Sequence, residues 1–254
     1  GRRGDIGHPE PLRQDDLRPP PGRRPVRTGA VVVAAGSGER LGADMPKALV
    51  RVAGRPMVAW SVRALARASD IAAVVVTCPP GREREMAAAL GDGAPVHAIV
   101  PGGSSRQRSV AAGIAALPAD VEAILVHDAA RPLLTPALVD RLTARVTDSS
   151  GVIAAAPVAD TLKHAGGDDV VLATVDRAGL WGAQTPQVFG AGVLRAAFAD
   201  AGDAELDAAT DCAGMAERRG VPVHMLDPGA PNLKVTTPAD LRLAEVLLGA
   251  GRIT

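Results

Sequence analysis

The chain has 254 residues, of which 47% are apolar and 22% are charged, and its 28 basic and 28 acidic side chains give a net charge of zero. This is the composition of an ordinary globular protein, and the absence of a basic excess argues against nucleic acid or a membrane surface as a partner. Two Phe, two Trp and no Tyr leave few rings on which single-stranded nucleic acid could stack. Any anion site must therefore be a local group of cations.

Targeting and covalent cross-links are also constrained. No apolar run reaches 18 residues, so no segment is predicted to cross a bilayer. Cys78 and Cys212 lack the spacing of metal ligands, and we expect two buried thiols in a cytoplasmic protein. Residues 1–28 are polar and rich in proline, with no apolar signal region, so we expect a flexible leader. A single domain is predicted over residues 29–254.

From residue 29 onward, apolar segments that indicate buried strands alternate with segments of helical spacing. The predicted strands cover residues 30–36, 71–78, 96–100, 122–128, 151–158 and 221–226, with a short one at 232–235. The predicted helices cover residues 56–68, 83–90, 104–117, 135–146, 191–199 and 208–219, and a last helix begins with Thr237 as cap and Pro238 as first residue. This alternation predicts an α/β fold with a mostly parallel sheet covered by helices on both faces.

The alternation stops between Asp160 and Trp181. Two short β-like runs, around Leu162 and over residues 170–175, flank the glycine-rich segment HAGGDD. A glycine-rich turn between alternating segments predicts a β-hairpin. Because an isolated hairpin is marginally stable in water, we expect this arm, about residues 158–181, to pack on another subunit.

The loop after the first strand, AAGSGERLGADMPKAL, combines small residues with two cations, Arg40 and Lys47. Its glycines match neither the phosphate loop of nucleotide hydrolases nor the dinucleotide fingerprint, which argues against a nicotinamide-dependent oxidoreductase. The small residues let a nucleotide lie close to the backbone, below the two cations. In a partly enclosed site a charge pair at about 4 Å contributes roughly 4 kcal/mol, against about 1 kcal/mol in water. Two solvated surface charges are the alternative interpretation.

This loop resembles the signature of sugar-nucleotide-type nucleotidyltransferases, loosely G-x-G-x-R followed by P-K. Four further segments are similar to one family, 2-C-methyl-D-erythritol 4-phosphate cytidylyltransferase of the non-mevalonate isoprenoid pathway: PGGSSRQRSV, VHDAARPLL, ATVDRAGLWGAQTPQVF and NLKVTTPADL. The match in order and spacing extends from Gly29 to the end of the chain. The resemblance implies a Rossmann-like three-layer nucleotidyltransferase fold, and a homodimer formed through the protruding β-hairpin arm.

The resemblance also implies the reaction. The cytidylyl group of CTP passes to 2-C-methyl-D-erythritol 4-phosphate, giving 4-(cytidine 5'-diphospho)-2-C-methyl-D-erythritol and pyrophosphate. The attacking phosphate oxygen is already anionic, so the protein need only hold two polyanions in line and neutralise charge at the α-phosphorus. Mg²⁺ is implied as cofactor, bound mainly through the CTP phosphates, and no side chain is assigned as a metal ligand.

Residue roles follow from the same resemblance. The catalytic cations are Arg40, Lys47, Arg177 and Lys234. The nucleotide-binding residues are Ala34, Ala35, Gly36, Gly103, Ser104, Ser109 and Ala129. Of these, Gly103, Ser104 and Ser109 correspond to the residues that read cytosine; a helix N-cap by Ser104 or Ser105 is the simpler interpretation of that segment. The substrate-binding residues are Asp128, Arg131, Thr161, Arg177, Thr185, Thr210 and Lys234, and the arm supplies Thr161 and Arg177 to the neighbouring subunit.

Several alternatives stay open. Asp128 would accept from substrate hydroxyls or lie near the magnesium, but Asp128 and Arg131 are also placed to form a surface salt bridge; His127 is expected to be structural. Many family members have Thr-Asp followed by a second acid, where this chain has Cys212. A ribitol 5-phosphate cytidylyltransferase would share the CTP half of the site. A non-catalytic nucleotide-binding module is the third possibility, and the retained cations argue against it.

Overall fold

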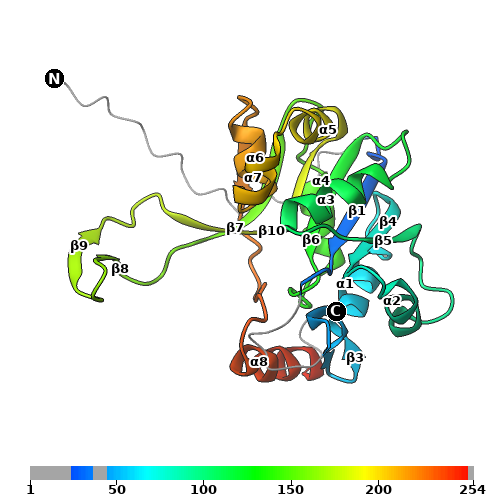
Figure 1. Cartoon of the computed structure of the whole chain (residues 1–254), viewed down its shortest axis with the longest axis horizontal. Helices are drawn as coiled ribbons and strands as arrows, with labels where there is room; N and C mark the ends of the chain where they lie inside the picture. Colours follow the sequence, from blue (N-terminus) through cyan, green and yellow to red (C-terminus); the bar gives the residue numbers. More distant parts are fainter. Residues whose placement is uncertain (1–23, 37–44, 251–254) are drawn as a thin grey trace.

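A seven-stranded sheet lies at the centre of the computed structural model, which describes residues 24–36 and 45–250 (Figure 1). The strands of the described chain are β1 (Thr28–Val33), β2 (Arg51–Val52), β3 (Arg55–Pro56), β4 (Ile71–Cys78), β5 (Ala98–Pro101), β6 (Ala123–Asp128), β7 (Gly151–Pro157), β8 (Leu162–Ala165), β9 (Val171–Val175), β10 (Trp181–Gly190) and β11 (Val223–Leu226). The helices are α1 (Met57–Leu65), α2 (Glu83–Leu90), α3 (Arg106–Ala115), α4 (Pro136–Thr143), α5 (Ala191–Ala199), α6 (Asp203–Ala208), α7 (Cys212–Glu217) and α8 (Pro238–Gly249), with a 3₁₀ turn, η3, at Lys47–Leu49.

The sheet is mostly parallel, as predicted. Its strand order is β11-β7-β10-β6-β1-β4-β5. Strand β10 runs antiparallel to its neighbours β6 and β7, whereas β1 is parallel to both β4 and β6. The central strands are rich in Val, Ile and Ala because they are buried on both faces.

Helices cover both faces of the sheet, which gives three layers. On one face, Val32 and Leu125 pack with buried residues of α1, α2 and α4. On the other face, Val31 and Ile124 pack with buried residues of α3, α5 and α7. Adjacent residues of one strand therefore belong to different cores, as the alternation of side chains along a strand requires.

Residues 24–28, at the end of the predicted leader, contact the domain. Thr28 is buried as the first residue of β1, Arg24 pairs with Glu122, and the Arg27 guanidinium lies 3.0 Å from Asp120. The earlier part of the leader, residues 1–23, lies outside the described residues.

Four sequence expectations differ from the structure. The long strand β10 was not predicted; it contains Pro186, which sits at a register shift between Ala183 and Gln187, the kind of irregularity where a strand tolerates proline. Residues 232–235 form no strand, because the Val235 N–H donates to the Ala130 carbonyl at 2.8 Å, which joins the segment to a loop.

The predicted helix over residues 208–219 is only α7, and α6, which was not predicted, ends where the predicted helix would begin. Asp211 adopts an extended backbone and caps α7, its carboxylate accepting the Gly214 N–H at 2.9 Å, so the chain cannot continue helically through it. Pro56 precedes α1 as its N-cap residue and belongs to the small β2–β3 hairpin, where the sequence predicted it inside the first turn.

The predicted arm is present as the antiparallel pair β8–β9, and Figure 1 shows it extending away from the sheet. At its base, Trp181 pairs with Pro157. Large apolar side chains are exposed along the arm and its base: Val170, Val171, Leu172, Val175, Leu180 and Trp181. None of the helices in the described part of the chain is long and apolar enough to cross a membrane.

Candidate active site

The predicted nucleotide loops lie at the carboxyl edge of the parallel strands, where open α/β sheets bind ligands. Val33, at the end of β1, pairs with Asp128 at the end of β6. The chain then turns over its neighbours: the Ala34 N–H donates to the Thr77 carbonyl at 2.9 Å, and the Ala129 N–H donates to the Val33 carbonyl at 3.0 Å. Ala34 and Ala129 are buried. Gly36 is exposed, and a Cβ placed there would meet nothing within 4 Å.

A second loop at this edge, between β5 and α3, is shaped by glycine. A Cβ on Gly102 would lie 2.6 Å from the Ala35 Cβ, and one on Gly103 would lie 2.4 Å from the Arg108 Cβ, so both positions exclude a side chain. The buried Ser109 hydroxyl accepts the Gly103 N–H at 3.1 Å and donates to the Ser105 carbonyl at 3.0 Å. Ser109 therefore holds the loop in shape.

The helix after this loop is capped by Ser105, one of the two residues proposed for that role. Its hydroxyl accepts the Arg108 N–H at 3.2 Å. Ser104 does not cap the helix; it lies beside Gly103, and both are exposed. The cap therefore accounts for Ser105 and leaves Gly103 and Ser104 on the surface of the loop.

Asp128 is the centre of a charged cluster. Arg106 donates from Nε at 3.0 Å and from Nη2 at 2.8 Å to Oδ1, and the Lys234 Nζ donates to Oδ2 at 2.8 Å. We call these three residues the Asp128 cluster. Burial acts to raise the pKa of Asp128, but the charges of Arg106 and Lys234 hold this pKa well below its usual range. Asp128 therefore stays ionised.

The alternative of a surface salt bridge between Asp128 and Arg131 is wrong. Asp128 is only 7% exposed, and its carboxylate pairs with Arg106 and Lys234. Arg131 is also buried, and its Nη1 donates to the Asn232 carbonyl at 2.6 Å. Burial lowers the pKa of Arg131.

A buried hydrogen-bonded frame surrounds the cluster. The Thr185 hydroxyl accepts the Asp128 N–H at 3.0 Å and lies 3.3 Å from Nδ1 of His127. The His127 Nε2 donates to the Arg131 carbonyl at 3.2 Å, and burial lowers the pKa of His127 to about 4. Asn232 donates to the Thr185 carbonyl at 2.8 Å. The frame fixes β6, β10 and the Lys234 segment to one another, and the neutral, fully buried His127 is part of it.

The segment carrying Lys47 joins the same region. The Lys47 N–H donates to the Gly36 carbonyl at 3.4 Å, and the Val235 N–H donates to the Ala130 carbonyl at 2.8 Å. One apolar cluster contains Val52 and Met57 after Lys47, Leu133 after β6, and Val235 next to Lys234. Lys47 is half-buried and the Lys234 side chain is 40% exposed. Packing therefore brings both lysine-bearing segments to the loop that follows β6.

Three other predicted residues are exposed, two of them in the arm, and a fourth lies outside the described residues. Thr161 and Arg177 are in the arm, which extends away from the sheet (Figure 1). Thr210 is exposed directly before the α7 cap. Arg40 lies outside the described residues.

Arg106 is the site residue that the sequence interpretation missed. It lies inside the family-like segment PGGSSRQRSV, and the signal was a charged residue at the first position of a helix, directly after a glycine loop. Its partner Asp128 is 22 residues away, so nothing local indicated the pairing. Cys212, the departure from the family pattern, lies beside it: Sγ is 4.0 Å from the Arg106 Nη1. Burial raises the pKa of Cys212 to about 11 although Arg106 acts to lower it, so this thiol is neutral.

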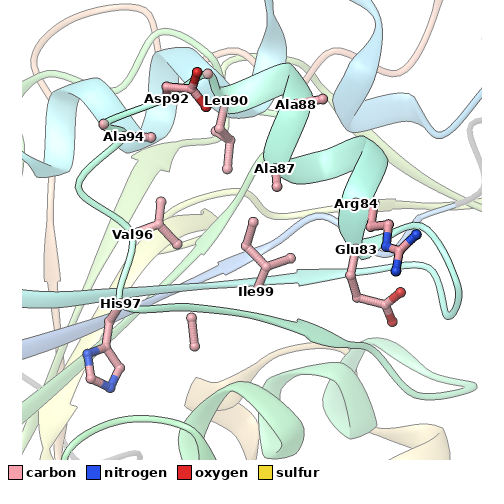
Figure 2. Close-up of a pocket in the computed structure, with 13 residues that line it drawn as sticks. Glu83, Arg84, Ala87, Ala88, Leu90, Asp92, Ala94, Val96, His97 and Ile99 are labelled. Carbon is pink, nitrogen blue, oxygen red and sulfur yellow. The ribbon is translucent and has the colours of Figure 1, made fainter.

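A cavity of about 570 Å³ lies elsewhere, between α2, the following loop and β5. Figure 2 shows Leu90, Val96 and Ile99 among its lining residues, with the charged Glu83 and Arg84 on the helix. It is lined by none of the predicted site residues. The candidate active site is therefore the strand edge around Asp128.

Comparisons with known proteins agree with one another. The IspD family model, described as 2-C-methyl-D-erythritol 4-phosphate cytidylyltransferase, matches residues 28–250. A protein of that name from Prochlorococcus marinus (strain MIT 9313) is 42% identical over 218 residues, covering 86% of this chain and 96% of the relative. One from Frankia casuarinae is 45% identical over 223 residues, covering 87% of this chain and 81% of the relative. The crystal structure of the protein of that name from Thermus thermophilus superposes with a TM-score of 0.69 at 34% identity, covering 86% of this chain and 97% of that one.

Proposed function

The chain belongs to the 2-C-methyl-D-erythritol 4-phosphate cytidylyltransferase family, and we propose that the Asp128 cluster and Lys47 form the site at which it works. The protein transfers the cytidylyl group of CTP to 2-C-methyl-D-erythritol 4-phosphate, releasing pyrophosphate. The observation that carries the assignment of the site is the buried Asp128 between two cations, at the carboxyl end of β6 and beside the small-residue loop after β1.

In the proposed mechanism, a phosphate oxygen of the acceptor attacks the α-phosphorus of CTP. A new oxygen–phosphorus bond forms as the bond to the bridging oxygen of pyrophosphate breaks, and pyrophosphate leaves with that electron pair. Lys47, together with Arg40, neutralises charge that develops on the phosphates, which is worth more in a partly enclosed site than in water. The protein supplies no covalent nucleophile.

Lys234 and Asp128 are proposed to bind the acceptor. The Lys234 ammonium is half-exposed and flexible, so it is able to exchange Asp128 for an incoming phosphate. Asp128 then accepts from hydroxyl groups of the polyol. The frame of Thr185, Arg131 and Asn232 keeps both residues in place, which matters because small misplacements are costly for in-line transfer.

The β5–α3 loop is proposed to read cytosine. Gly103 and Ser104 are exposed next to the buried Ser109, whose hydroxyl fixes their backbone. Backbone N–H and carbonyl groups on such a rigid turn match the amine and carbonyl of the cytosine edge. The small residues Ala34, Ala35, Gly36 and Ala129 leave room for the rest of the nucleotide.

Mg²⁺ is proposed to arrive with the CTP phosphates and to be held mainly by them, with Asp128 lying near it. The donor chemistry fits, because Mg²⁺ is commonly bound by one or two carboxylates together with substrate phosphates. When bound, it neutralises phosphate charge. In the part of the chain that the structure describes, no group of three or more His, Cys, Asp or Glu side chains forms a cage for a metal ion.

The arm is proposed to form the homodimer and to carry Thr161 and Arg177 to the partner's site. Its exposed apolar residues support this, because such a patch gains stability when a second subunit covers it. Thr210 is proposed to bind substrate from its exposed position before α7. Cys78 and Cys212 are free and buried, which supports the proposal of a cytoplasmic location.

The substrate assignment is tested by pyrophosphate release with CTP, Mg²⁺ and either 2-C-methyl-D-erythritol 4-phosphate or ribitol 5-phosphate. We expect higher kcat/KM with the methylerythritol phosphate. Preference for ribitol phosphate would replace the assignment with the ribitol enzyme. Binding of CTP with no pyrophosphate released from either acceptor would indicate a nucleotide-binding module.

A further inference from the structure

Arg106 connects the two halves of the candidate site. It is the first residue of α3, directly after the glycine loop proposed to hold cytosine. Its guanidinium reaches the carboxylate at the end of β6, which is proposed to hold the acceptor. A single side chain therefore joins the nucleotide loop to the substrate carboxylate.

All three nitrogens of this guanidinium have partners. Nε and Nη2 both donate to Oδ1 of Asp128, at 3.0 and 2.8 Å. Nη1 donates to Oε1 of Gln107 at 2.9 Å, and Gln107 is completely buried. The Arg106 side chain is only 23% exposed, so it is held from several directions and is poorly placed to bind a phosphate itself.

The two oxygens of Asp128 are held in different ways. Oδ1 faces Arg106, whose charge-assisted bonds have fixed geometry, whereas Oδ2 contacts the half-exposed Lys234. The other charged or titratable groups that influence this carboxylate are His127 and Arg131, on β6 and its following loop, and Cys212 on α7. The side chains that donate to its oxygens are Arg106 and Lys234.

We propose that Arg106 is a positioning residue for the transfer: it holds Oδ1 of Asp128 in place, so that Oδ2 alone exchanges between Lys234 and the acceptor. The inference rests on the proposed function of the same site. When Lys234 moves to a phosphate, Arg106 keeps Asp128 paired and keeps its carboxylate in the same orientation. Without Arg106, the released carboxylate would be free to rotate or to hold Lys234 away from the phosphate.

A double-mutant cycle in kcat/KM for the acceptor tests this. The variants are Arg106→Gln, Asp128→Asn and the combination of the two. Arg108→Gln is the matched control: Arg108 lies on the same helix but pairs with Asp203 and Asp207 at the surface. Arg106→Gln should lower kcat/KM by about 10- to 100-fold, the range for a misplaced reacting group, and leave the KM for CTP near its wild-type value.

The second arm of the cycle separates positioning from a structural role. If Arg106 acts through Asp128, Arg106→Gln in the Asp128→Asn background should cause no further loss. Arg108→Gln should change little in either background. Arg106→Lys keeps the charge but loses the planar guanidinium, so its kcat/KM should lie between those of the wild type and Arg106→Gln. If Arg106→Gln fails to fold, Arg106→Lys replaces it in the cycle.

Two results would overturn the proposal. One is that Arg106→Gln lowers kcat/KM by the same factor in the wild type and in the Asp128→Asn background. The other is that folded Arg106→Gln has the wild-type kcat/KM. Wild-type turnover is measured first in the same assay. Failure there would contradict the proposed function, whereas an active wild type with an additive cycle would contradict the role of Arg106 alone.

Discussion

Two adjacent buried residues at the end of β6 differ in charge because their partners differ. Asp128 keeps its charge because Arg106 and Lys234 contact both of its oxygens. His127 faces a hydroxyl and a carbonyl, so burial dominates and favours its neutral form. The same strand end therefore carries one fixed negative charge and one neutral ring.

The neutral His127 predicts a pH-dependent stability. Its pKa is about 4 in the folded protein against 6.5 ordinarily, so between these values the unfolded chain binds a proton that the folded chain does not. Stability should therefore fall as the pH drops from about 6.5 towards 4, by up to about 1.4 kcal/mol per pH unit from this residue. Urea unfolding from pH 7 to 5 measures it.

The control for this prediction is His127→Gln, in which the amide can still donate to the Arg131 carbonyl but does not titrate. Whatever its absolute stability, its unfolding free energy should depend less steeply on pH than that of the wild type. Equal slopes in the two proteins would show that folding does not lower the pKa of His127.

Lys47 is predicted to act on the rate. Lys47→Ala should lower kcat by about 10²- to 10³-fold, as does loss of a group that stabilises charge in the transition state, with little change in Tm. Arg51→Ala is the control, because Arg51 is exposed in the nearby β2 and donates to the Gly54 carbonyl. If both variants turned over at the wild-type rate, Lys47 would have no part in catalysis.

Asp128 and Lys234 could be identified from sequence, but their arrangement could not. A charged residue directly after a buried strand, and a lysine inside a family motif, are local signals. The contact between them spans 106 residues, and Arg106 reaches Asp128 only because β5, the glycine loop and α3 carry it to the same edge. Such pairings depend on sheet order, which no local pattern specifies.

At the scale of elements, the sequence predicted those with a strong period and clear caps. Strands β1, β4 and β6 are continuous apolar runs, and α8 begins with its predicted Thr237 cap and Pro238. Strand β10 was missed because its proline and its bulge break the alternating pattern. The Asp211 cap that divides α6 from α7 was missed because its carboxylate was considered only within a family motif.

The α8 cap gives a prediction for element stability. The Thr237 hydroxyl accepts the Asp240 N–H at 3.2 Å, and the Asp240 carboxylate accepts the Thr237 N–H at 2.8 Å. Thr237→Ala should lower the free energy of unfolding by about 1 kcal/mol, the usual effect of losing an N-cap. Thr237→Ser, which keeps the hydroxyl, should unfold near the wild-type midpoint in urea. Equal destabilisation by both changes would mean that the methyl group matters and the cap does not.

At the scale of the whole molecule, the arm decides whether one chain holds a complete site. Figure 1 shows β8 and β9 apart from the sheet, and Arg177 is exposed between β9 and β10. If Arg177 acts across a dimer, mixing Arg177→Ala subunits with Lys47→Ala subunits should restore activity, because each mixed dimer has one site with both residues. Verified mixed dimers that stay inactive would place Arg177 in its own subunit's site.

The central claim is that fixed cations promote direct transfer between two bound polyanions, without a covalent intermediate on the protein. Its most direct test is the stereochemistry at the α-phosphorus, using a single diastereomer of CTP with sulfur in place of a non-bridging α-oxygen. One in-line displacement by the acceptor phosphate predicts inversion of configuration in the product. Retention would require two displacements, and hence a nucleotidyl group carried by a protein side chain.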